Sequence, residues 1–238
     1  MTAPPLDTIE LPGARASFST RAGGVSEGPY ASLNLGILTD DEPTRVGENR
    51  RRLARAADLE PQAVAMGWQV HGTEIREWER PGSAFASPGE DLPRVDGHVT
   101  DRARLGLLVL VADCFPVALA GNGRVAMLHC GWRGLAGGIV ASALSRFERP
   151  PAAAVGPGIG ACCYEVGDEV RAEFAHIDGA ARGRMLDLRA IIEHQLREGG
   201  VARIAQVDRC TSCRDDLYFS HRRDHGVTGR QAGMVVRG

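Results

Sequence analysis

The chain has 238 residues, enough for one large domain or two small ones, and its 43% hydrophobic and 24% charged residues are ordinary for a soluble globular protein. The formal net charge of -2 at pH 7 favours neither a nucleic-acid partner nor an anionic membrane surface. No apolar run is long enough to cross a bilayer and no signal peptide is recognised, so we expect a cytoplasmic protein. All 28 basic residues are arginine, which excludes a Schiff-base lysine and a P-loop lysine.

The first third of the chain predicts a loop, a helix and a strand. Residues 16–34 are rich in Gly, Ser and Pro, which is typical of a shaped loop, and Arg21 stands beside two of its glycines. Residues 43–59 predict a helix with one apolar face and an N-cap at Thr44. Residues 64–70 predict a strand, which a histidine follows.

Residues 81–94 form the stretch most typical of a linker, because Pro, Gly and Ser dominate it. We expect an exposed loop here, either a lid or an insertion. Apolar residues resume at once at Val95, so this loop does not mark a domain boundary. This stretch therefore gives no reason to divide residues 1–238 into two domains.

Two apolar runs in the middle of the chain each end in a reactive residue. Residues 107–112 end at Asp113-Cys114, and residues 125–128 end at His129. Such runs predict strands that are buried on both faces, with Cys114 and His129 at the ends of neighbouring strands. A buried thiol and a hydrogen-bonded histidine in two core strands would give the same pattern, so the stretch alone leaves both interpretations open.

The second half of the chain predicts alternating strands and helices. Asp187 is the expected N-cap of an amphipathic helix that two glycines end. The glycines before residue 135 would place backbone N–H groups at a helix N-terminus, where an anion could bind. The predicted helices cover residues 135–147, a short stretch to about 175, and 187–198, and the predicted strands cover 152–159, 202–207 and 232–236.

Six cysteines without a secretion signal are expected to be reduced thiols. Cys210 and Cys213 form a lone C-x-x-C motif. A zinc knuckle would need a second pair at similar spacing, and Cys162 and Cys163 are adjacent instead. A redox pair is the alternative.

His71, Cys114 and His129 each follow or end an apolar segment. One thiolate and two neutral imidazoles make a suitable three-ligand zinc set, which leaves a fourth position for water or substrate. Zinc in such a site lowers the pKa of a bound water to about 7. Catalytic zinc ligands have no fixed long-range spacing, so the spacing alone does not establish the site.

Short motifs along nearly the whole chain carry a family resemblance. The most specific are ADCFP at 112–116 and HCGWRG at 129–134. The others are STRAGGVS at 19–26, SLNLG at 32–36, QVHG at 69–72, DGHVT at 96–100, GPGI at 156–159, YEVG at 164–167, CT at 210–211, FSHRR at 219–223 and TGR at 228–230. With them the sequence resembles the laccase-domain family of the YfiH type, formerly called multicopper polyphenol oxidases.

The resemblance implies a fold, a metal and an activity. The implied fold is a single layered α/β domain of mixed sheets flanked by helices, similar to the cytotoxic-necrotizing-factor-like fold. The implied metal is Zn²⁺, held by His71, Cys114 and His129. Relatives phosphorolyse adenosine, inosine, guanosine and methylthioadenosine, and some deaminate adenosine, so the implied partners are a purine nucleoside and phosphate.

Two residues depart from the family pattern. Cys130 stands where the family usually has Ala, and His221 stands where it usually has Tyr. A second thiol beside the site could ligate metal, but a strand neighbour's side chain should point to the opposite face. If the position of His221 touches substrate, specificity differs from that of the relatives.

Five further residues are candidates for the site. Asp113 is a candidate proton carrier beside the metal, or a capping carboxylate at a strand end. Arg21 and Arg133 are candidates for phosphate, because a guanidinium fork suits its oxygens, and a structural ion pair is the alternative for Arg133. Asn34 and Gln69 are candidates for hydrogen bonds to ribose or base.

Three other interpretations stay open. A copper oxidase could use His71, Cys114 and His129 as a blue-copper centre with Cu²⁺, but its trinuclear cluster needs many further imidazoles, and no His-x-His pairs occur. A metal-free cysteine hydrolase would use Cys114 as nucleophile and His129 as base. A zinc-stabilised protein without turnover is the third.

Overall fold

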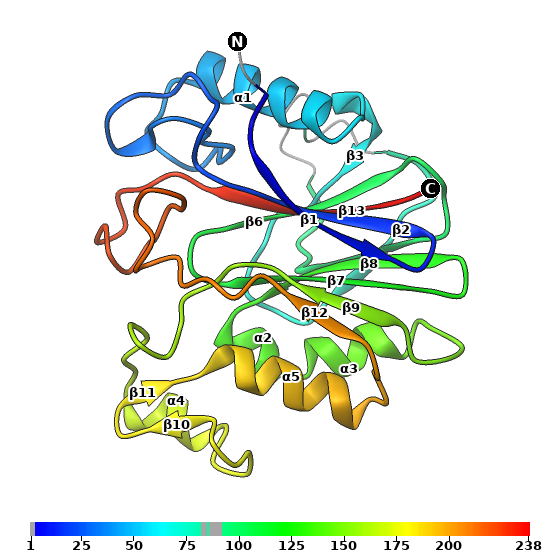
Figure 1. Ribbon diagram of the computed structural model, residues 1–238, viewed down its shortest axis with the longest axis vertical. Coiled ribbons are helices and arrows are strands. Elements are labelled where there is room, and N and C mark those ends of the chain that lie inside the picture. The colour runs from blue at the N-terminus through cyan, green and yellow to red at the C-terminus, as the bar shows by residue number, and fades with distance from the viewer. Residues whose placement is uncertain (1–2, 82–84, 86–91) are drawn as a thin grey trace.

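Two β-sheets packed face to face form the centre of the protein in a computed structural model that describes residues 3–81, 85 and 92–238 (Figure 1). The five-stranded sheet has the order β1-β2-β13-β6-β3. Only β3 and β6 are parallel in it. Its strands are β1 Leu6–Leu11, β2 Ala14–Ser19, β13 Gln231–Arg237, β6 Gly106–Val111 and β3 Val64–Ala65.

The second sheet has six strands in the order β12-β9-β7-β8-β5-β4. The outer pairs β12/β9 and β4/β5 are parallel, and the three inner pairs are antiparallel. Its strands are β12 Ile204–Gln206, β9 Ala152–Val155, β7 Phe115–Gly121, β8 Arg124–Cys130, β5 Gly97–Thr100 and β4 Ile75–Glu77. A short ribbon joins β10 Ala181–Arg182 to β11 Met185–Leu186.

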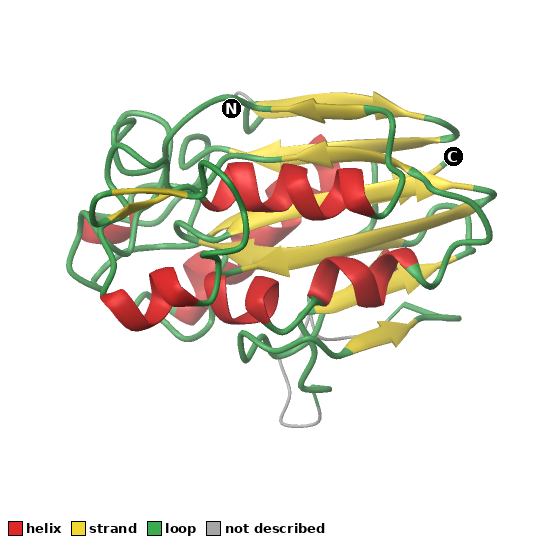
Figure 2. Cartoon of the chain, turned by 90° about the horizontal axis from the view of Figure 1, so that it is seen from below, coloured by secondary structure: helices red, strands yellow, loops and turns green. Residues whose placement is uncertain are grey.

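Helices cover both outer faces of the pair of sheets (Figure 1). Helix α1, Pro43–Ala56, lies on the five-stranded sheet, and the helices below the six-stranded sheet stand in front of its strands in Figure 2. Those are α2 Trp132–Ala136, α3 Ile139–Leu144 and α5 Leu188–Glu198. Helix α4, Asp168–Ala172, and the 3-10 turns η1 Gly28–Tyr30 and η2 Pro61–Ala63 complete the elements.

The four layers explain the continuous apolar runs in the sequence. In β6, Leu107 and Val109 face the space between the sheets, whereas Leu108 packs under α1. In β8, Met127 faces the space between the sheets and Leu128 packs toward α3 and α5. A strand with apolar neighbours on both faces keeps no polar alternation, as the sequence predicted.

The structure confirms the expected fold class and several elements. The predicted strands at 107–112, 125–128 and 232–236 are β6, β8 and β13. The helix at 187–198 is α5, and Asp187 caps it by accepting a bond from the Ala190 N–H at 3.0 Å. The helix at 43–59 is α1, although its N-cap is Glu42 rather than Thr44, because Pro43 takes the first helical position.

Five expectations were wrong in extent. The first residues of the loop predicted at 16–34 belong to strand β2. Only the first two residues of the strand predicted at 64–70 form a strand, β3. The helix at 135–147 is two short helices, because Gly138 stands between them at φ +88°. The strands at 152–159 and 202–207 are shorter than predicted. Most of the loop predicted at 81–94 lies outside the described residues.

Among the described residues, none of the helices combines the length and the apolar character that a membrane span requires.

A buried histidine lies between the sheets beside Trp78. The Trp78 Nε1–H donates to Nδ1 of His98 at 3.1 Å, and His98 has no exposed surface. Burial lowers the pKa of His98 from 6.5 to about 4, so the folded protein holds this ring neutral.

We therefore expect stability to fall as the pH drops from 6.5 toward 4. The unfolded chain binds a proton at His98 in this range and the folded protein does not, which removes about 3 kcal/mol of the free energy of unfolding. Urea unfolding at pH 7.0, 5.5 and 4.5 measures this loss, and His98→Asn should lose less over the same range. An equal loss in both proteins would contradict the prediction.

Candidate active site

The carboxylate of Asp96 organises the site. Asp96 precedes β5 and has no exposed surface. Its Oδ2 accepts bonds from the N–H groups of Gly72 at 2.7 Å and Val70 at 3.0 Å. Its Oδ1 accepts from the His71 N–H at 2.9 Å and lies 2.8 Å from Nδ1 of His129. The carboxylate therefore holds the turn at 70–72 against β8.

The three residues predicted as metal ligands lie together beside this anchored turn. One ligand atom from each of His71, Cys114 and His129 lies within 4.8 Å of the others. His71 sits at φ +60° in the anchored turn, and His129 lies in β8 opposite Pro116. A Cβ at Gly131 would lie 3.0 Å from Cys114 Sγ and 3.1 Å from His71 Cδ2, so a side chain there would crowd both candidate ligands.

The same contacts set the protonation of the Cys114–His129 pair. Burial opposes a thiolate, but the imidazolium of His129 and hydrogen bonds from His129 and His71 outweigh it and lower the pKa of Cys114 to about 6. Burial also opposes the imidazolium, but Cys114 and Asp96 raise the pKa of His129 to about 9. Without metal, a thiolate and an imidazolium therefore face each other.

The three residues fit a metal ion in their chemistry. Two imidazoles and one thiolate are a suitable donor set for zinc and also for copper. Asp96 bonds Nδ1 of His129, which directs Nε2 toward Cys114, and a second-layer carboxylate of this kind is typical of metal-binding histidines. Cys130 is buried in the core on the other side of β8, as expected for a strand neighbour.

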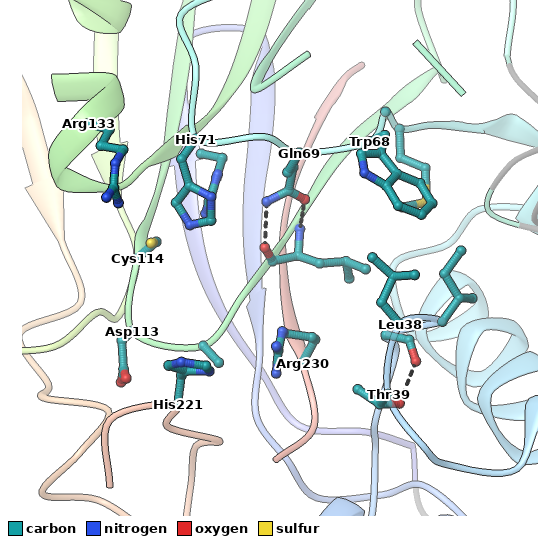
Figure 3. A pocket seen from close by; sticks show the side chains of 18 of the residues that line it. Leu38, Thr39, Trp68, Gln69, His71, Asp113, Cys114, Arg133, His221 and Arg230 are labelled. Atoms are coloured by element: carbon teal, nitrogen blue, oxygen red, sulfur yellow. Dashed lines mark hydrogen bonds between the residues drawn. The ribbon is translucent and has the colours of Figure 1, made fainter. Parts of the chain in front are cut away.

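A cavity of about 410 Å³ opens beside the three candidate ligands, as Figure 3 shows. His71, Cys114 and Arg133 lie on one side of it, and Leu38 and Trp68 lie on the other. A mainly apolar cavity of this size with a few convergent polar groups suits a small-molecule substrate.

Three of the other predicted site residues line this cavity. Asp113 is held at φ +90°, with Oδ1 accepting from Thr211 Oγ1 at 2.6 Å and Oδ2 from the Arg222 N–H at 2.7 Å. Arg133 lies over the Trp132 ring at 4.3 Å and forms no salt bridge with any described carboxylate.

Gln69 lines the cavity but uses both ends of its amide on the backbone of β6. Its Nε2 donates to the Leu110 carbonyl at 2.7 Å, and its Oε1 accepts from the Leu110 N–H at 2.8 Å (Figure 3). The side-chain amide therefore bonds Leu110 of β6 as the backbone of a neighbouring strand would. These bonds do not favour the predicted hydrogen bond from Gln69 to ribose or base.

Arg21 and Asn34 do not line the cavity. The Arg21 guanidinium donates to the carbonyls of Ala31 at 2.8 Å and Asp215 at 3.0 Å and lies over the Phe219 ring at 4.6 Å. Phosphate binding by Arg21 stays a prediction, which its bonds from Nε and Nη1 to backbone carbonyls do not favour.

Asn34 instead builds a wall of the cavity. It is fully buried, its Nδ2 donates to Thr39 Oγ1 at 2.9 Å, and its Oδ1 accepts from the Arg230 N–H at 2.9 Å. Thr39 and Arg230 both line the cavity. These bonds do not favour the predicted hydrogen bond from Asn34 to ribose or base, and they place Asn34 behind the residues that line the cavity.

Sequence reasoning assigned no role to several residues that line the cavity. They are Leu38, Trp68, Tyr164, Arg222 and Arg230, and His221 lines it as well. Their only distinguishing feature in the sequence is their place in or beside short motifs. Arg230 ends TGR, Tyr164 begins YEVG, and Trp68 precedes QVHG. Nothing in those motifs indicates which side chains point into a cavity.

The fold and the site define a layered α/β protein with a His-Cys-His centre, and comparisons with known proteins agree with the fold and give the family. The sequence model of a family described as "Multi-copper polyphenol oxidoreductase laccase" matches residues 15–238. The chain belongs to this laccase-like family, to which the YfiH proteins also belong. The resemblance seen in the sequence is thereby confirmed.

Three relatives illustrate the similarity. "Purine nucleoside phosphorylase YlmD" of Geobacillus stearothermophilus is 36% identical, covering 94% of this chain and 90% of its own length. "Purine nucleoside phosphorylase YfiH" of Escherichia coli is 36% identical over 94% and 93%. The crystal structure of the Bacillus licheniformis hypothetical protein YfiH is similar with a TM-score of 0.89 at 31% identity, covering 94% and 93% of the two chains.

Asp96→Asn tests the anchoring of this site. An amide places a donor where the carboxylate accepts four bonds, so we expect the affinity of the three candidate ligands for a divalent metal ion to fall about 10- to 100-fold. The free energy of unfolding of the metal-free protein should fall by about 3 kcal/mol. Chelator competition and urea unfolding measure the two effects. The matched control is Asp101→Asn at an exposed position beyond β5, and equal values for both variants would contradict the prediction.

Proposed function

We propose that the protein is a zinc-dependent purine nucleoside phosphorylase. The observation that carries the proposal is the juxtaposition, in one cavity, of a His-Cys-His centre, arginine side chains and an aromatic wall. The names of relatives at 36% identity, which cover nearly the whole chain, support a purine nucleoside enzyme. Zn²⁺ bound by His71, Cys114 and His129 would supply a Lewis acid beside the substrate.

The two sides of the cavity suit the two halves of a nucleoside. Trp68 and Leu38 offer an apolar surface on which a flat purine can stack. Arg133, on the side of His71 and Cys114, offers a guanidinium group that suits phosphate oxygens (Figure 3). The ribose would then lie between them, with its C1′ atom facing the phosphate.

In this proposal a phosphate oxygen attacks ribose C1′ and the bond from C1′ to the base nitrogen breaks. The electron pair of that bond leaves with the base, which takes up one proton, and ribose 1-phosphate is the second product. Arg133 neutralises charge on the phosphate and holds it in line with C1′. Asp113 and His221 line the cavity as titratable groups, and Asp113 stays the predicted proton carrier.

The oxidase alternative has less support. The family description names a multi-copper laccase, and the donor set suits copper. However, within the described part of the chain the potential metal-binding groups are this centre and a group of four cysteines, so no second histidine group is present. A trinuclear copper cluster would require one.

One observation favours a second candidate function. In the absence of metal, the lowered pKa of Cys114 and the adjacent His129 resemble the nucleophile and base of a cysteine hydrolase. Such an activity would survive a chelator and would be lost on alkylation of Cys114. The zinc-dependent enzyme would show the opposite response to the chelator.

Incubation of zinc-analysed protein with adenosine, with and without phosphate, tests the reaction type. We expect adenine only when phosphate is present, as chromatography of the products can show. Inosine as a product would establish deamination as a second activity. Adenine released equally without phosphate would contradict phosphorolysis.

Arg133→Met tests the phosphate contact. Because a charge-assisted hydrogen bond contributes about 1.5–3 kcal/mol, we expect the KM for phosphate to rise about 10- to 100-fold, with a small change in the KM for nucleoside. Arg146→Met, at an exposed position after α3, is the matched control and should change neither constant. A rise confined to the nucleoside KM would contradict the assignment.

A further inference from the structure

Four cysteines that lie outside the cavity meet at the edge of the six-stranded sheet. Cys162 and Cys163 follow β9, and Cys210 and Cys213 follow β12. Strands β9 and β12 are parallel neighbours, so the segments that follow them leave the sheet at the same end of the two strands. A bridge between Gly158 and Cys210 extends this pairing, with the Thr211 N–H donating to the Gly158 carbonyl at 3.0 Å.

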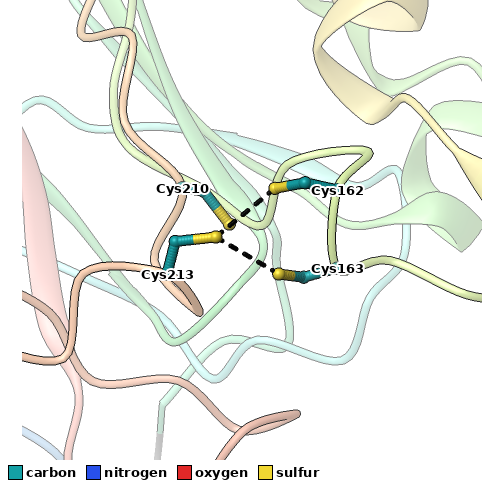
Figure 4. Close-up of side chains that lie close together, drawn as sticks. All are labelled: Cys162, Cys163, Cys210 and Cys213. Carbon is teal, nitrogen blue, oxygen red and sulfur yellow. Dashed lines mark hydrogen bonds between the residues drawn. The ribbon is translucent and has the colours of Figure 1, made fainter.

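The four sulfur atoms converge on one point (Figure 4). All lie within 4.8 Å of one another, and Cys213 Sγ is 3.5 Å from Cys162 Sγ and 3.3 Å from Cys163 Sγ. These separations exceed a disulfide bond of about 2.05 Å, and all four cysteines are free. A tetrahedron with Zn–S bonds of about 2.3 Å has edges of about 3.8 Å, which is close to the observed separations.

We propose that Cys162, Cys163, Cys210 and Cys213 bind one structural Zn²⁺ ion, separate from the ion in the cavity. Four thiolates around one point complete a closed zinc site and leave no position for substrate. An iron–sulfur cluster would attach its cysteines to separate iron atoms and spread the sulfurs farther apart. On binding, each thiol releases its proton to solvent and the sulfur donates its electron pair to the ion.

The local backbone suits this arrangement. A turn, in which the N–H groups of Cys163 and Tyr164 donate to the Gly160 carbonyl at 2.9 and 3.1 Å, lets two adjacent cysteines reach the same centre. The Gly160 N–H donates to Cys210 Sγ at 3.2 Å, as N–H groups do to metal-bound thiolates. A Cβ at Gly160 would lie 3.2 Å from Cys162 Sγ, so the turn has little room for a side chain.

The proposed ion would tie together two segments that support the cavity. Tyr164 follows the first cysteine pair directly and lines the cavity. Thr211 follows Cys210 and donates to the carboxylate of Asp113 beside Cys114. The four-cysteine site therefore has a structural role for the cavity wall and does not depend on which reaction occurs in the cavity.

Metal content of purified variants tests the proposal. We expect about two zinc ions per chain in the parent protein and about one in Cys210→Ser/Cys213→Ser. His71→Ala/His129→Ala should also hold about one, and that remaining ion, exchanged for Co²⁺, should show the absorption of a tetrathiolate site. Ser212→Ala, between the two cysteines, is the matched control and should keep both ions. Unchanged zinc in the double-serine variant, or iron in place of zinc, would overturn the proposal.

Alkylation of the parent protein gives a test that needs no variant. With zinc bound, the tryptic peptide 210–214 should stay unmodified by iodoacetamide, and after chelation it should be alkylated. Cys130 has no exposed surface and serves as the internal control, protected in both states. Equal alkylation of peptide 210–214 before and after chelation, or a disulfide between Cys210 and Cys213 in protein purified without air, would overturn the proposal. Neither readout requires nucleoside turnover.

Discussion

The buried carboxylate of Asp96 is the interaction on which the candidate site depends. An ionised carboxylate without exposed surface is costly unless each oxygen is hydrogen-bonded, and here three backbone N–H groups and His129 satisfy it. Burial alone would raise the pKa of Asp96, but these partners lower it below its usual range. The same bonds fix the turn that carries His71 and the ring orientation of His129, so one side chain positions two of the three candidate ligands.

The third ligand is placed by the way the chain passes between the sheets. Strand β6 belongs to the five-stranded sheet and β7 to the six-stranded sheet, and only Ala112, Asp113 and Cys114 separate them. This short crossing requires the positive φ of Asp113, whose carboxylate is held by Thr211 and the Arg222 N–H. Cys114 therefore lies at the edge of the space between the two sheets, where the cavity opens.

Sequence reasoning found the parts that local patterns determine. The apolar runs of β6 and β8 and the cap of α5 follow from burial and capping, and the family motifs contained the three candidate ligands. It could not find contacts that depend on tertiary approach. Gln69 and Asn34 have side chains suited to a ligand, but β6 and the loop at 36–39 occupy them. The spacing of the four cysteines in the sequence did not indicate a common site. They come together only because strand β9 pairs with strand β12.

We propose that an enzyme reaction in the cavity beside His71, Cys114 and His129 transfers ribose from a purine to phosphate. The phosphorus-31 NMR spectrum of the zinc-loaded protein with inosine and inorganic phosphate tests it most directly. The account predicts a ribose 1-phosphate signal that grows as the phosphate signal declines, and no such signal with Cys114→Ala. Release of hypoxanthine without a phosphate ester, or the same signal from the Cys114→Ala protein, would contradict the account.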